Sequence, residues 1–411
     1  AAGPAPPMVE YWRRRLRAPI ATVTFKPTWT RAGDPLWPQN QGENTCEALT
    51  VAIRERVLLL GATGTTGRLT LRHLLALGIP TTVAGRSAEK LAALAGDTGL
   101  ETTEVRIDDR EGLARAFTGH AVVVNCVGPF LRFGSAPVEA ALDACLHYLD
   151  SSWEQAHFLR LAKYDEVAKR QGITVIPGAG VSPGVSDLLV AIGARHRGRE
   201  PIESVTVHYV EGAGNRFSYG TLLANVEVLK ANSYRLAGGE LVAMRVGEKR
   251  KTVEFPGRLG RQRLMLYPGA DVAAVSRSYQ VRDVEHYFGA QWFTGVLGLL
   301  GRLRFRPDSV LVRAVCSTAV RLQGLVPGGR TGFAQVVDLR WRLAHGSRAC
   351  RVGLCGDEVY EVTARLLASC AAKLVHSASA PTGVVSPGRA FDPDDLLDAI
   401  GLTAVVAADP G

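Results

Sequence analysis

The hydrophobic pattern of residues 57–86 predicts a strand, a turn, a helix and a second strand. The apolar run Val57–Leu60 is short and has no polar face, which is typical of a parallel strand covered on both sides. Leucines at helical spacing continue to Leu77, and Gly78 ends the helix. Thr81–Ala84 is the second strand. This unit is typical of the start of a parallel α/β sheet.

Short apolar strands and amphipathic helices keep alternating as far as residue 176. An alternation of this length predicts a doubly wound parallel sheet, a Rossmann fold, with right-handed crossovers and a ligand crevice at the carboxyl ends of its strands. The further strands are expected at Thr103–Ile107, Ala121–Cys126, His147–Asp150 and Ile173–Ile176, and the helices at 88–95, 110–117, 135–146 and 154–171.

Beyond about residue 200 the pattern changes to alternating polar and apolar positions. Such alternation is typical of half-buried strands, so we expect a second, α+β domain with a mainly antiparallel sheet. Its strands are expected at 204–210, 252–255, 263–267, 278–281, 333–343 and 351–355, with helices at 221–230 and 358–375. The apolar stretch Tyr287–Leu300 predicts a buried helix or a lid over an apolar pocket, and the alternative is an interfacial helix in contact with a membrane.

A chain of 411 residues is too long for one ordinary core, so it is divided into parts. We expect an N-terminal extension at 1–54, a dinucleotide-binding Rossmann domain at 55–200 and a substrate domain at 201–380. Residues 381–411 are expected to form a C-terminal segment that packs back on the Rossmann domain.

Composition excludes some classes of function. With 46% hydrophobic and 21% charged residues the chain is globular, and its net charge of +9 is scattered. This basic excess fits an anionic cofactor, and the chain carries no nucleic-acid-binding motif, so no nucleic acid is expected as a partner. Seven cysteines without a CxxC pair predict a reduced, cytoplasmic protein, and no metal site is expected.

Glycines at three-residue spacing lie between the first strand and the helix. Gly61, Gly64 and Gly67 permit a tight turn, a close approach of phosphate and close packing of helix on strand. The helix N-terminus adds unpaired N–H groups and a positive dipole end, which suit a pyrophosphate. The turn therefore predicts a dinucleotide site made by Gly61, Thr63, Gly64, Thr65, Thr66 and Gly67.

The ends of the next strands refine the choice of dinucleotide. Arg86 and Ser87 stand where an acidic residue would bind the ribose of NAD, which favours the 2′-phosphate of NADP, unless Arg86 is only a solvated surface residue. Asp108 follows the third strand and is expected beside the adenine. Residues at the end of the fourth strand and just after it are expected near the nicotinamide ribose, unless they are a plain loop: Asn125, Val127, Gly128 and Pro129.

Reduction of a substrate needs a proton source near the nicotinamide. Tyr148 and Asp150 share one side of the fifth strand, and Asp187 follows the sixth, so these three are the catalytic candidates. A core position for Tyr148 and helix-capping roles for Asp150 and Asp187 are the alternatives. Ser218, Tyr219 and Thr221 are expected to reach the crevice from the second domain.

Several motifs together resemble the saccharopine dehydrogenase-like oxidoreductases. They are GATGTTG at 61–67, AGRS at 84–87, NCVGPF at 125–130, HYLD at 147–150 and PGAGVSPGVSDLL at 177–189. The resemblance implies NADP as cofactor and a homodimer formed through the sheet of the second domain. Members include saccharopine reductases and the trans-acting enoyl reductases of lipid pathways. Ser182 stands where the saccharopine reductases have an acidic residue, which argues against an amino-acid substrate.

The sequence therefore predicts an NADPH-dependent oxidoreductase. Its substrate is expected to be an apolar enoyl, imine or carbonyl compound of lipid or specialised metabolism. Two alternatives stay open. One is an NADP-binding regulator without turnover, and the other is a non-redox cyclase or isomerase that has kept the fold.

Overall fold

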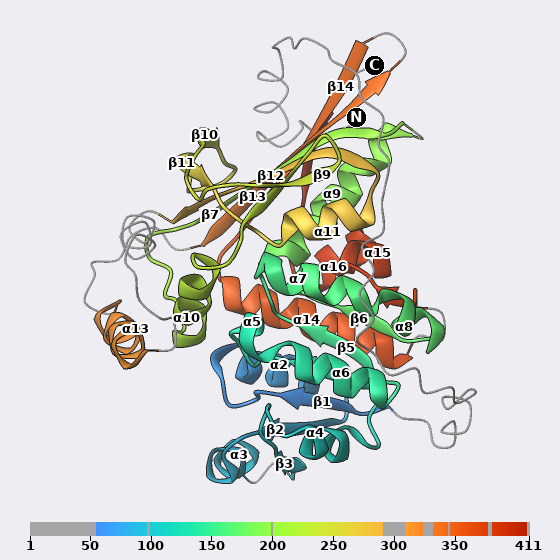
Figure 1. Ribbon diagram of the computed structural model, residues 1–411, viewed down its shortest axis with the longest axis vertical. Coiled ribbons are helices and arrows are strands. Elements are labelled where there is room, and N and C mark those ends of the chain that lie inside the picture. Colours follow the sequence, from blue (N-terminus) through green and yellow to red (C-terminus); the bar gives the residue numbers. More distant parts are fainter. Residues whose placement is uncertain are drawn as a thin grey trace, which may run out of the picture.

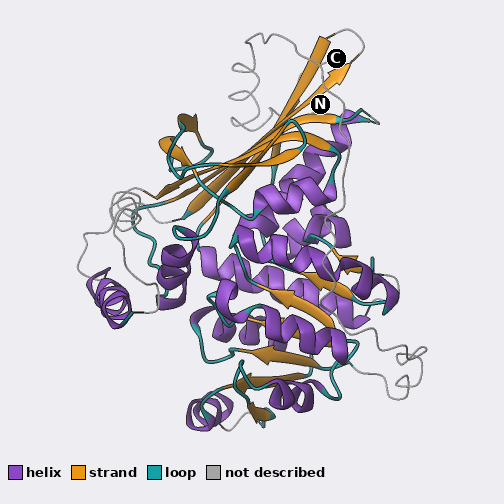
Figure 2. Cartoon of the chain, in the orientation of Figure 1, coloured by secondary structure: helices purple, strands orange, loops and turns teal. Residues whose placement is uncertain are grey.

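The computed structural model describes residues 55–96, 99–198, 200–290, 309–323, 332–343, 346–376 and 380–408. They form two sheets, one in each half of the molecule, with helices between them (Figure 1). The secondary-structure view shows the smaller sheet sandwiched by helices and the larger one carrying helices on the side toward it (Figure 2). The fold class predicted from the sequence, a Rossmann sheet plus a second α+β part, is confirmed.

The first sheet is parallel throughout, in the order β15-β6-β5-β4-β1-β2-β3. The chain winds outward from β1 in both directions, which places a topological switch point between β1 and β4. Its strands are β1 (Val57–Leu60), β2 (Thr81–Gly85), β3 (Thr102–Glu104), β4 (Val122–Asn125), β5 (His147–Asp150), β6 (Thr174–Ile176) and β15 (Gly383–Val384).

Helices cover both faces of this sheet, which explains why strands such as β1 and β4 consist only of buried residues. The helices are α2 (Thr65–Ala76), α3 (Ala88–Ala95), α4 (Arg110–Phe117), α5 (Phe130–Phe133), α6 (Ser135–Asp143), α7 (Gln155–Leu161) and α8 (Asp165–Arg170). Some predicted bounds were wrong, and the helix expected at 135–146 ends at Asp143. The helix expected at 154–171 is broken by a 3₁₀ turn at Ala162–Tyr164, and β3 ends at Glu104 instead of Ile107.

The second sheet has nine strands, and its main path is β10-β11-β12-β7-β13-β14-β16. All of its pairings are antiparallel except that between β12 and β7. The strands are β7 (Ile202–Glu211), β8 (Tyr234–Ala237), β9 (Glu240–Ala243), β10 (Arg250–Glu254), β11 (Arg261–Leu266), β12 (Val281–Ala290), β13 (Phe333–Leu343), β14 (Gly346–Gly356) and β16 (Val405–Ala408). Residues 381–408 thus supply a strand to each sheet, β15 to the first and β16 to the second.

Helices between the sheets share one hydrophobic core with both of them. This core joins Leu59 of β1, Leu189 of α9 and Leu339 of β13. A Cβ on Gly193 of α9 would lie 2.4 Å from the Leu339 side chain, so glycine lets this helix approach the second sheet closely. The remaining helices are α9 (Ser186–Ala194), α10 (Tyr219–Val228), α11 (Asp271–Ser278), α13 (Val310–Leu322), α14 (Val359–His376), α15 (Pro387–Ala390) and α16 (Pro393–Ala399).

The helix predicted at Tyr287–Leu300 is wrong in its described part. Residues 287–290 end β12, which begins at Val281, where the sequence predicts the end of a strand. Tyr287 packs beside His208 on one face of the sheet, and Phe288 packs beside Tyr209 on the other. Because both faces are covered here, the strand lacks the alternation that would have identified it. Residues 291–300 lie outside the described residues.

One cysteine differs from the prediction of a fully reduced protein. Cys145 is disulfide-bonded, and its partner lies outside the described residues. Five other cysteines are reduced thiols: Cys126, Cys316, Cys350, Cys355 and Cys370. Within the part of the chain that the structure describes, no helix has the length and apolar character needed to cross a membrane.

Candidate active site

The glycine-rich turn after β1 has the geometry that a bound pyrophosphate requires. Gly61 has a φ of +82°, and a Cβ on Gly67 would lie 2.2 Å from the Gly61 carbonyl oxygen. Gly64 is the N-cap of α2, so no side chain caps this helix, and its first turn holds no acidic residue. The first N–H groups of α2 therefore remain available to an anion, and the turn fits the phosphates of a dinucleotide.

Arg86 lies in the position expected for contact with a 2′-phosphate. It is exposed directly after β2, and no described carboxylate forms an ion pair with it. Its neighbour Ser87 instead caps α3, where its Oγ accepts a hydrogen bond from the Lys90 N–H at 3.3 Å. Asp108 is exposed beyond the end of β3 and pairs with Arg106 at 2.8 Å. Of these three predicted residues, Arg86 alone is uncommitted.

The loop after β4 is held in place from the interior. Asn125 is fully buried; its Nδ2 donates to the Tyr148 hydroxyl at 3.0 Å, and its Oδ1 accepts from the Val127 N–H at 2.9 Å. The side chain therefore fixes the loop that contains Gly128 and Pro129. Cys126 and Gly128 line the cavity described below, whereas Asn125 does not.

Tyr148 and Asp150, two predicted catalytic residues, belong to a buried polar network. The Tyr148 hydroxyl and His157 Nε2 donate to Asp150 Oδ2 at 3.1 and 3.0 Å. The N–H groups of Ser152 and Gly178 donate to Oδ1. Burial raises the pKa of Asp150, but the hydrogen bonds from His157, Ser152 and Gly178 outweigh it and hold this pKa below its ordinary value.

Neither residue of this pair lines the cavity. Their positions give them a supporting role beneath the loops that follow β4 and β5, and a catalytic role stays a prediction.

Asp187, the third predicted catalytic residue, lies in α9 at some remove from the cavity. It is 1% exposed, and its Oδ2 accepts the Gly388 N–H at the start of α15 at 2.7 Å. Burial raises the pKa of Asp187 to about 6. Asp187 is absent from the cavity lining, and its contact with α15 is that of a capping residue.

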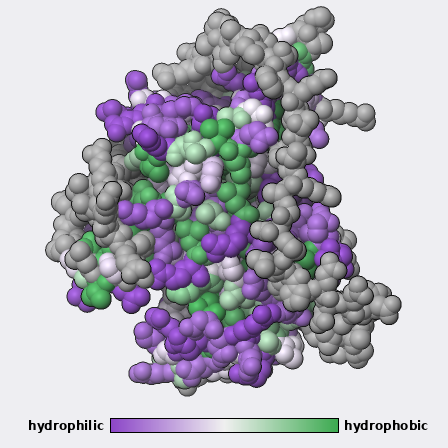
Figure 3. Space-filling view, viewed as in Figure 1, coloured by the Kyte–Doolittle hydropathy of each residue, from purple (hydrophilic) through white to green (hydrophobic). Residues whose placement is uncertain are grey.

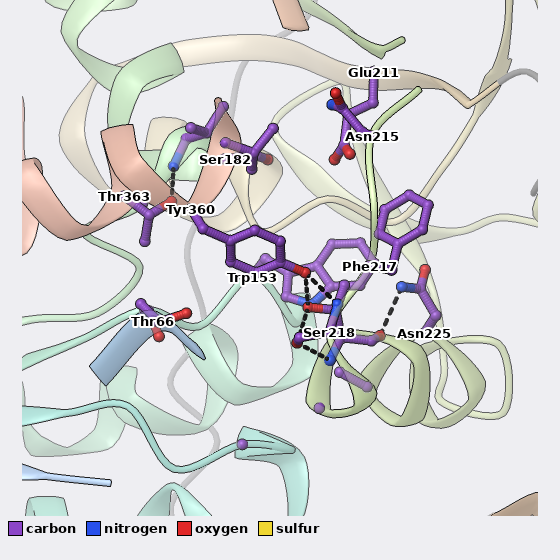
Figure 4. A pocket seen from close by; sticks show the side chains of 18 of the residues that line it. Thr66, Trp153, Ser182, Glu211, Asn215, Phe217, Ser218, Asn225, Tyr360 and Thr363 are labelled. Carbon is purple, nitrogen blue, oxygen red and sulfur yellow. Dashed lines mark hydrogen bonds between the residues drawn. The ribbon is translucent and has the colours of Figure 1, made fainter. Parts of the chain in front are cut away.

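A cavity lies where the carboxyl ends of the Rossmann strands face the second sheet (Figure 4). The loops after β4, β5 and β6 form one wall, together with Thr66 at the start of α2. The opposite wall comes from β7, β12, α10 and the start of α14. Most of its large side chains are aromatic or apolar: Phe130, Trp153, Val181, Tyr209, Phe217, Phe288, Val359 and Tyr360. On the face seen in Figure 3, hydrophobic residues also gather between the two halves of the molecule.

Two segments of the second half, the start of α10 and the start of α14, meet at Tyr360. Its hydroxyl accepts the Ser218 N–H at 2.6 Å and lies 2.9 Å from the Thr221 hydroxyl (Figure 4). Ser218 and Thr221 line the cavity as expected, whereas Tyr219 points outward and is 40% exposed. Next to Tyr360, Glu361 pairs with His73 of α2 at 2.8 Å, which ties the start of α14 to the phosphate-binding helix.

Ser182 reaches the cavity from the loop after β6, and a buried pair lies behind it. Asp271 Oδ2 accepts both the Ser182 hydroxyl at 2.8 Å and His286 Nδ1 at 2.6 Å. Burial raises the pKa of Asp271, but the charge and hydrogen bond of His286 bring it below its ordinary value. The proton of the Ser182 hydroxyl is thus directed at Asp271, so Ser182 faces the cavity as an acceptor.

Glu211 is a cavity residue that the sequence analysis missed. It ends β7, is 8% exposed, and its Oε1 accepts the Tyr209 hydroxyl at 2.6 Å. Burial raises the pKa of Glu211 to about 7. The strand was expected to end at Val210. Had the strand been extended by one residue, Glu211 would have been predicted on the same face as Tyr209, because residues two apart on a strand share a face.

Comparison with known proteins identifies the Rossmann part. The family model for the saccharopine dehydrogenase NADP binding domain matches residues 57–176. A lipid droplet localized protein of Caenorhabditis elegans is 26% identical over 55% of this chain and 59% of its own length. A putative trans-acting enoyl reductase of Mycobacterium tuberculosis is 30% identical over 43% of this chain and 45% of its own length. The chain thus spans about half the length of these curated relatives.

A solved structure extends the likeness to the whole fold. The apo saccharopine dehydrogenase (L-Glu forming) of Saccharomyces cerevisiae aligns with 87% of this chain and all of its own, with a TM-score of 0.60 and 16% identity. At this identity the likeness shows the fold. The family match confirms NADP as the predicted cofactor. Residues 57–176 are therefore a saccharopine dehydrogenase-type NADP-binding domain.

Proposed function

We propose that this protein is an NADPH-dependent reductase of an apolar enoyl, imine or carbonyl substrate. One observation carries the proposal: the aromatic wall of the second half faces the carboxyl edge of an NADP-binding sheet across one cavity. In Rossmann folds this edge is where the reactive end of the cofactor lies. Bound NADPH would supply a hydride there. The relative named as an enoyl reductase is consistent with this chemistry.

The polar groups of the cavity favour an apolar substrate over an amino acid. An amino acid brings a carboxylate and an ammonium group, and each needs a charged partner. Arg216 is the one arginine or lysine among the described lining residues, and it is exposed. Glu154 already accepts the N–H groups of Phe130 and Trp153 at 2.8 and 3.0 Å. The aromatic walls would instead bury an apolar chain and exclude water from the reacting atoms.

The test combines cofactor binding with turnover. Fluorescence titration should show NADPH binding, and NADPH should be consumed with a long-chain enoyl thioester, a long-chain aldehyde or a hydrophobic cyclic imine. Glutamate with a short aldehyde serves as the polar control. Absence of NADPH binding would contradict the proposal. Binding without consumption of NADPH by any of these compounds would favour the regulator instead.

The 2′-phosphate contact has its own test. Arg86→Ala should weaken NADPH binding about tenfold, because it removes the uncommitted cation after β2, and should leave NADH binding nearly unchanged. Arg115→Ala is the matched control, since Arg115 is also exposed but lies on α4 beside Glu111. Equal effects of Arg86→Ala on the two cofactors would exclude Arg86 from phosphate recognition.

A further inference from the structure

We infer that Glu211, backed by Tyr209, is the acid of this cavity, the group that delivers a proton to a bound substrate. The inference rests on the proposed function for the identity of the reaction. The choice of the Glu211 carboxyl as the proton donor comes from the geometry of β7. A hydride acceptor must also gain a proton, and neither the dinucleotide-binding turn nor the aromatic walls supply one.

Glu211 and Tyr209 lie on the cavity side of the second sheet. Residues two apart on a strand share a face, and Tyr209 packs against Phe288 of the adjacent strand, which also lines the cavity. The Tyr209 hydroxyl donates to one carboxyl oxygen of Glu211 at 2.6 Å. This bond fixes the carboxyl group at the cavity wall, beside Asn215 (Figure 4).

The charges around Glu211 favour its neutral form. Tyr209 shares its strand, Asn215 and Arg216 follow in the next loop, and Glu358 and Tyr360 face it from the start of α14. The partners of Glu211 in the sheet register are Ala290 of β12 and Phe333 of β13, which carry no charge. No described lysine, arginine or histidine forms an ion pair with Glu211, and the Glu358 carboxylate disfavours a second negative charge nearby.

Other polar groups near the cavity are poorer proton donors. The Ser182 hydroxyl already donates to Asp271. Burial raises the pKa of Glu154 as well, but its two carboxyl oxygens accept the Phe130 and Trp153 N–H groups, and these bonds favour its charged form. Burial raises the pKa of the phenols of Tyr209 and Tyr360 above the ordinary tyrosine value, which makes them weaker acids. Tyr148 and Asp150 donate and accept within the interior. Glu211 lines the cavity, and its carboxyl group holds a proton that it can donate.

The reaction balances with groups already named. The acceptor carbon gains two electrons as the hydride that NADPH supplies when bound. The partner atom, an oxygen, a nitrogen or the carbon next to a carbonyl, then takes the proton from the Glu211 carboxyl, whose O–H bond breaks. The Glu211 carboxylate then regains a proton from solvent. Until it does, the hydrogen bond from the Tyr209 hydroxyl keeps the carboxylate in position. Tyr209 is thus a positioning residue.

The test observes the carboxyl group directly and needs no substrate. Infrared difference spectra of the whole protein, recorded across a pH titration, should show loss of a carboxylic-acid band with a midpoint near pH 7. Glu211→Gln should remove this band. Asp187→Asn should remove a second band with a midpoint near pH 6 and leave the first in place. Glu285→Gln, on the opposite face of the sheet, should leave both bands unchanged.

The outcomes separate the two proposals. A spectrum of Glu211→Gln identical to that of the wild type between pH 6 and 8 would overturn the assignment of Glu211. If Glu211→Gln fails to fold, Glu211→Asp replaces it and should shift the midpoint of the band. The assignment is overturned if the midpoint stays unchanged. A band that depends on Glu211 in a protein that consumes no NADPH would leave the acid in place and reject the reductase.

Discussion

Two adjacent parallel strands each carry a tyrosine whose hydroxyl donates to a glutamate two residues away. On β7 the Tyr209 hydroxyl donates to Glu211 at 2.6 Å, and on β12 the Tyr287 hydroxyl donates to Glu285 at 2.8 Å. The first pair faces the cavity, and the second faces the opposite side of the sheet. Both hydrogen bonds join residues two apart on one strand, although the tyrosine precedes the glutamate on β7 and follows it on β12. The surroundings of the two carboxyl groups differ more.

The surroundings differ in positive charge. Lys249 forms an ion pair with Glu285, and Lys251 lies 3.8 Å from the same carboxylate. Burial raises the pKa of Glu285, but the lysines and the Tyr287 hydrogen bond hold it below the ordinary value. Burial also raises the pKa of Glu211, and no described cation opposes this effect, so the pKa rises to about 7. Glu211 is also more deeply buried, at 8% exposed against 19% for the Glu285 side chain. The comparison teaches that burial and a nearby cation, and not the tyrosine, decide whether such a carboxyl keeps its proton.

The largest expected difference between the pairs is in catalysis. Glu211→Gln should lower kcat by about 100-fold or more with little change in KM, because it removes the proton donor and keeps the shape. Glu285→Gln should change kcat less than about twofold, because its side chain faces away from the cavity. Steady-state rates of NADPH consumption with the best acceptor measure both.

A second variant separates chemistry from structure. Glu211→Ala should be partly rescued by added formate, whose carboxyl group can occupy the vacated space. The prediction is contradicted if formate does not restore the rate of Glu211→Ala and Glu285→Gln loses as much kcat as Glu211→Gln.

The next difference is in the pH dependence of stability, with opposite signs for the two glutamates. The pKa of Glu211 is raised from 4.5 to about 7, so its stabilising contribution is full below pH 4.5 and is lost as pH rises through 7. As pH rises from about 4 to about 8, the free energy of unfolding of Glu211→Gln should therefore increase by about 3 kcal/mol relative to that of the wild type. Urea unfolding of both proteins at several pH values measures the gain.

Glu285 provides the matched case with the reverse sign. The pKa of Glu285 is lowered on folding. Its contribution to stability is therefore present above the pKa of the unfolded chain, and is lost as pH falls through the pKa of the folded protein. Because both lysines are more than 40% exposed, we expect Glu285→Gln to cost only about 1 kcal/mol at neutral pH and nothing in acid. Parallel pH profiles for the two variants would show that their surroundings are equivalent.

The contrast also explains what the sequence could reveal. The phosphate-binding turn was predictable because its constraints are local: Gly61 needs a positive φ, and Gly67 permits contact between helix and turn. The position of Arg86 was predictable because it follows a strand whose place in the fold was known, whereas its contact with a 2′-phosphate stays a prediction. These residues occupy fixed positions in a strand–turn–helix unit, so the pattern alone identifies them.

The cavity was not predictable because its walls come from distant segments. Glu211 and Tyr360 lie about 150 residues apart in the chain and meet only through the packing of the second sheet on α14. No short motif encodes that meeting. Tyr148 and Asp150 show the converse limit. Their strand and its edge were predicted as observed, but hydrogen bonds to Asn125 and His157 direct their polar atoms inward.

The smallest expected difference concerns the two tyrosines. The Tyr209 hydrogen bond favours the charged form of Glu211, so Tyr209→Phe should raise the pKa of Glu211 further and move the alkaline limb of the rate profile to higher pH. Tyr287→Phe should leave the rate profile unchanged and cost about 1 kcal/mol of stability, the usual value of one hydrogen bond. Rate profiles and urea unfolding of both variants provide the check. A loss of activity in Tyr209→Phe as large as that in Glu211→Gln, with no shift of the limb, would mean that the phenol, and not the carboxyl, releases the proton. The two faces of the sheet would then differ in the role of the tyrosine instead of the charge on the glutamate.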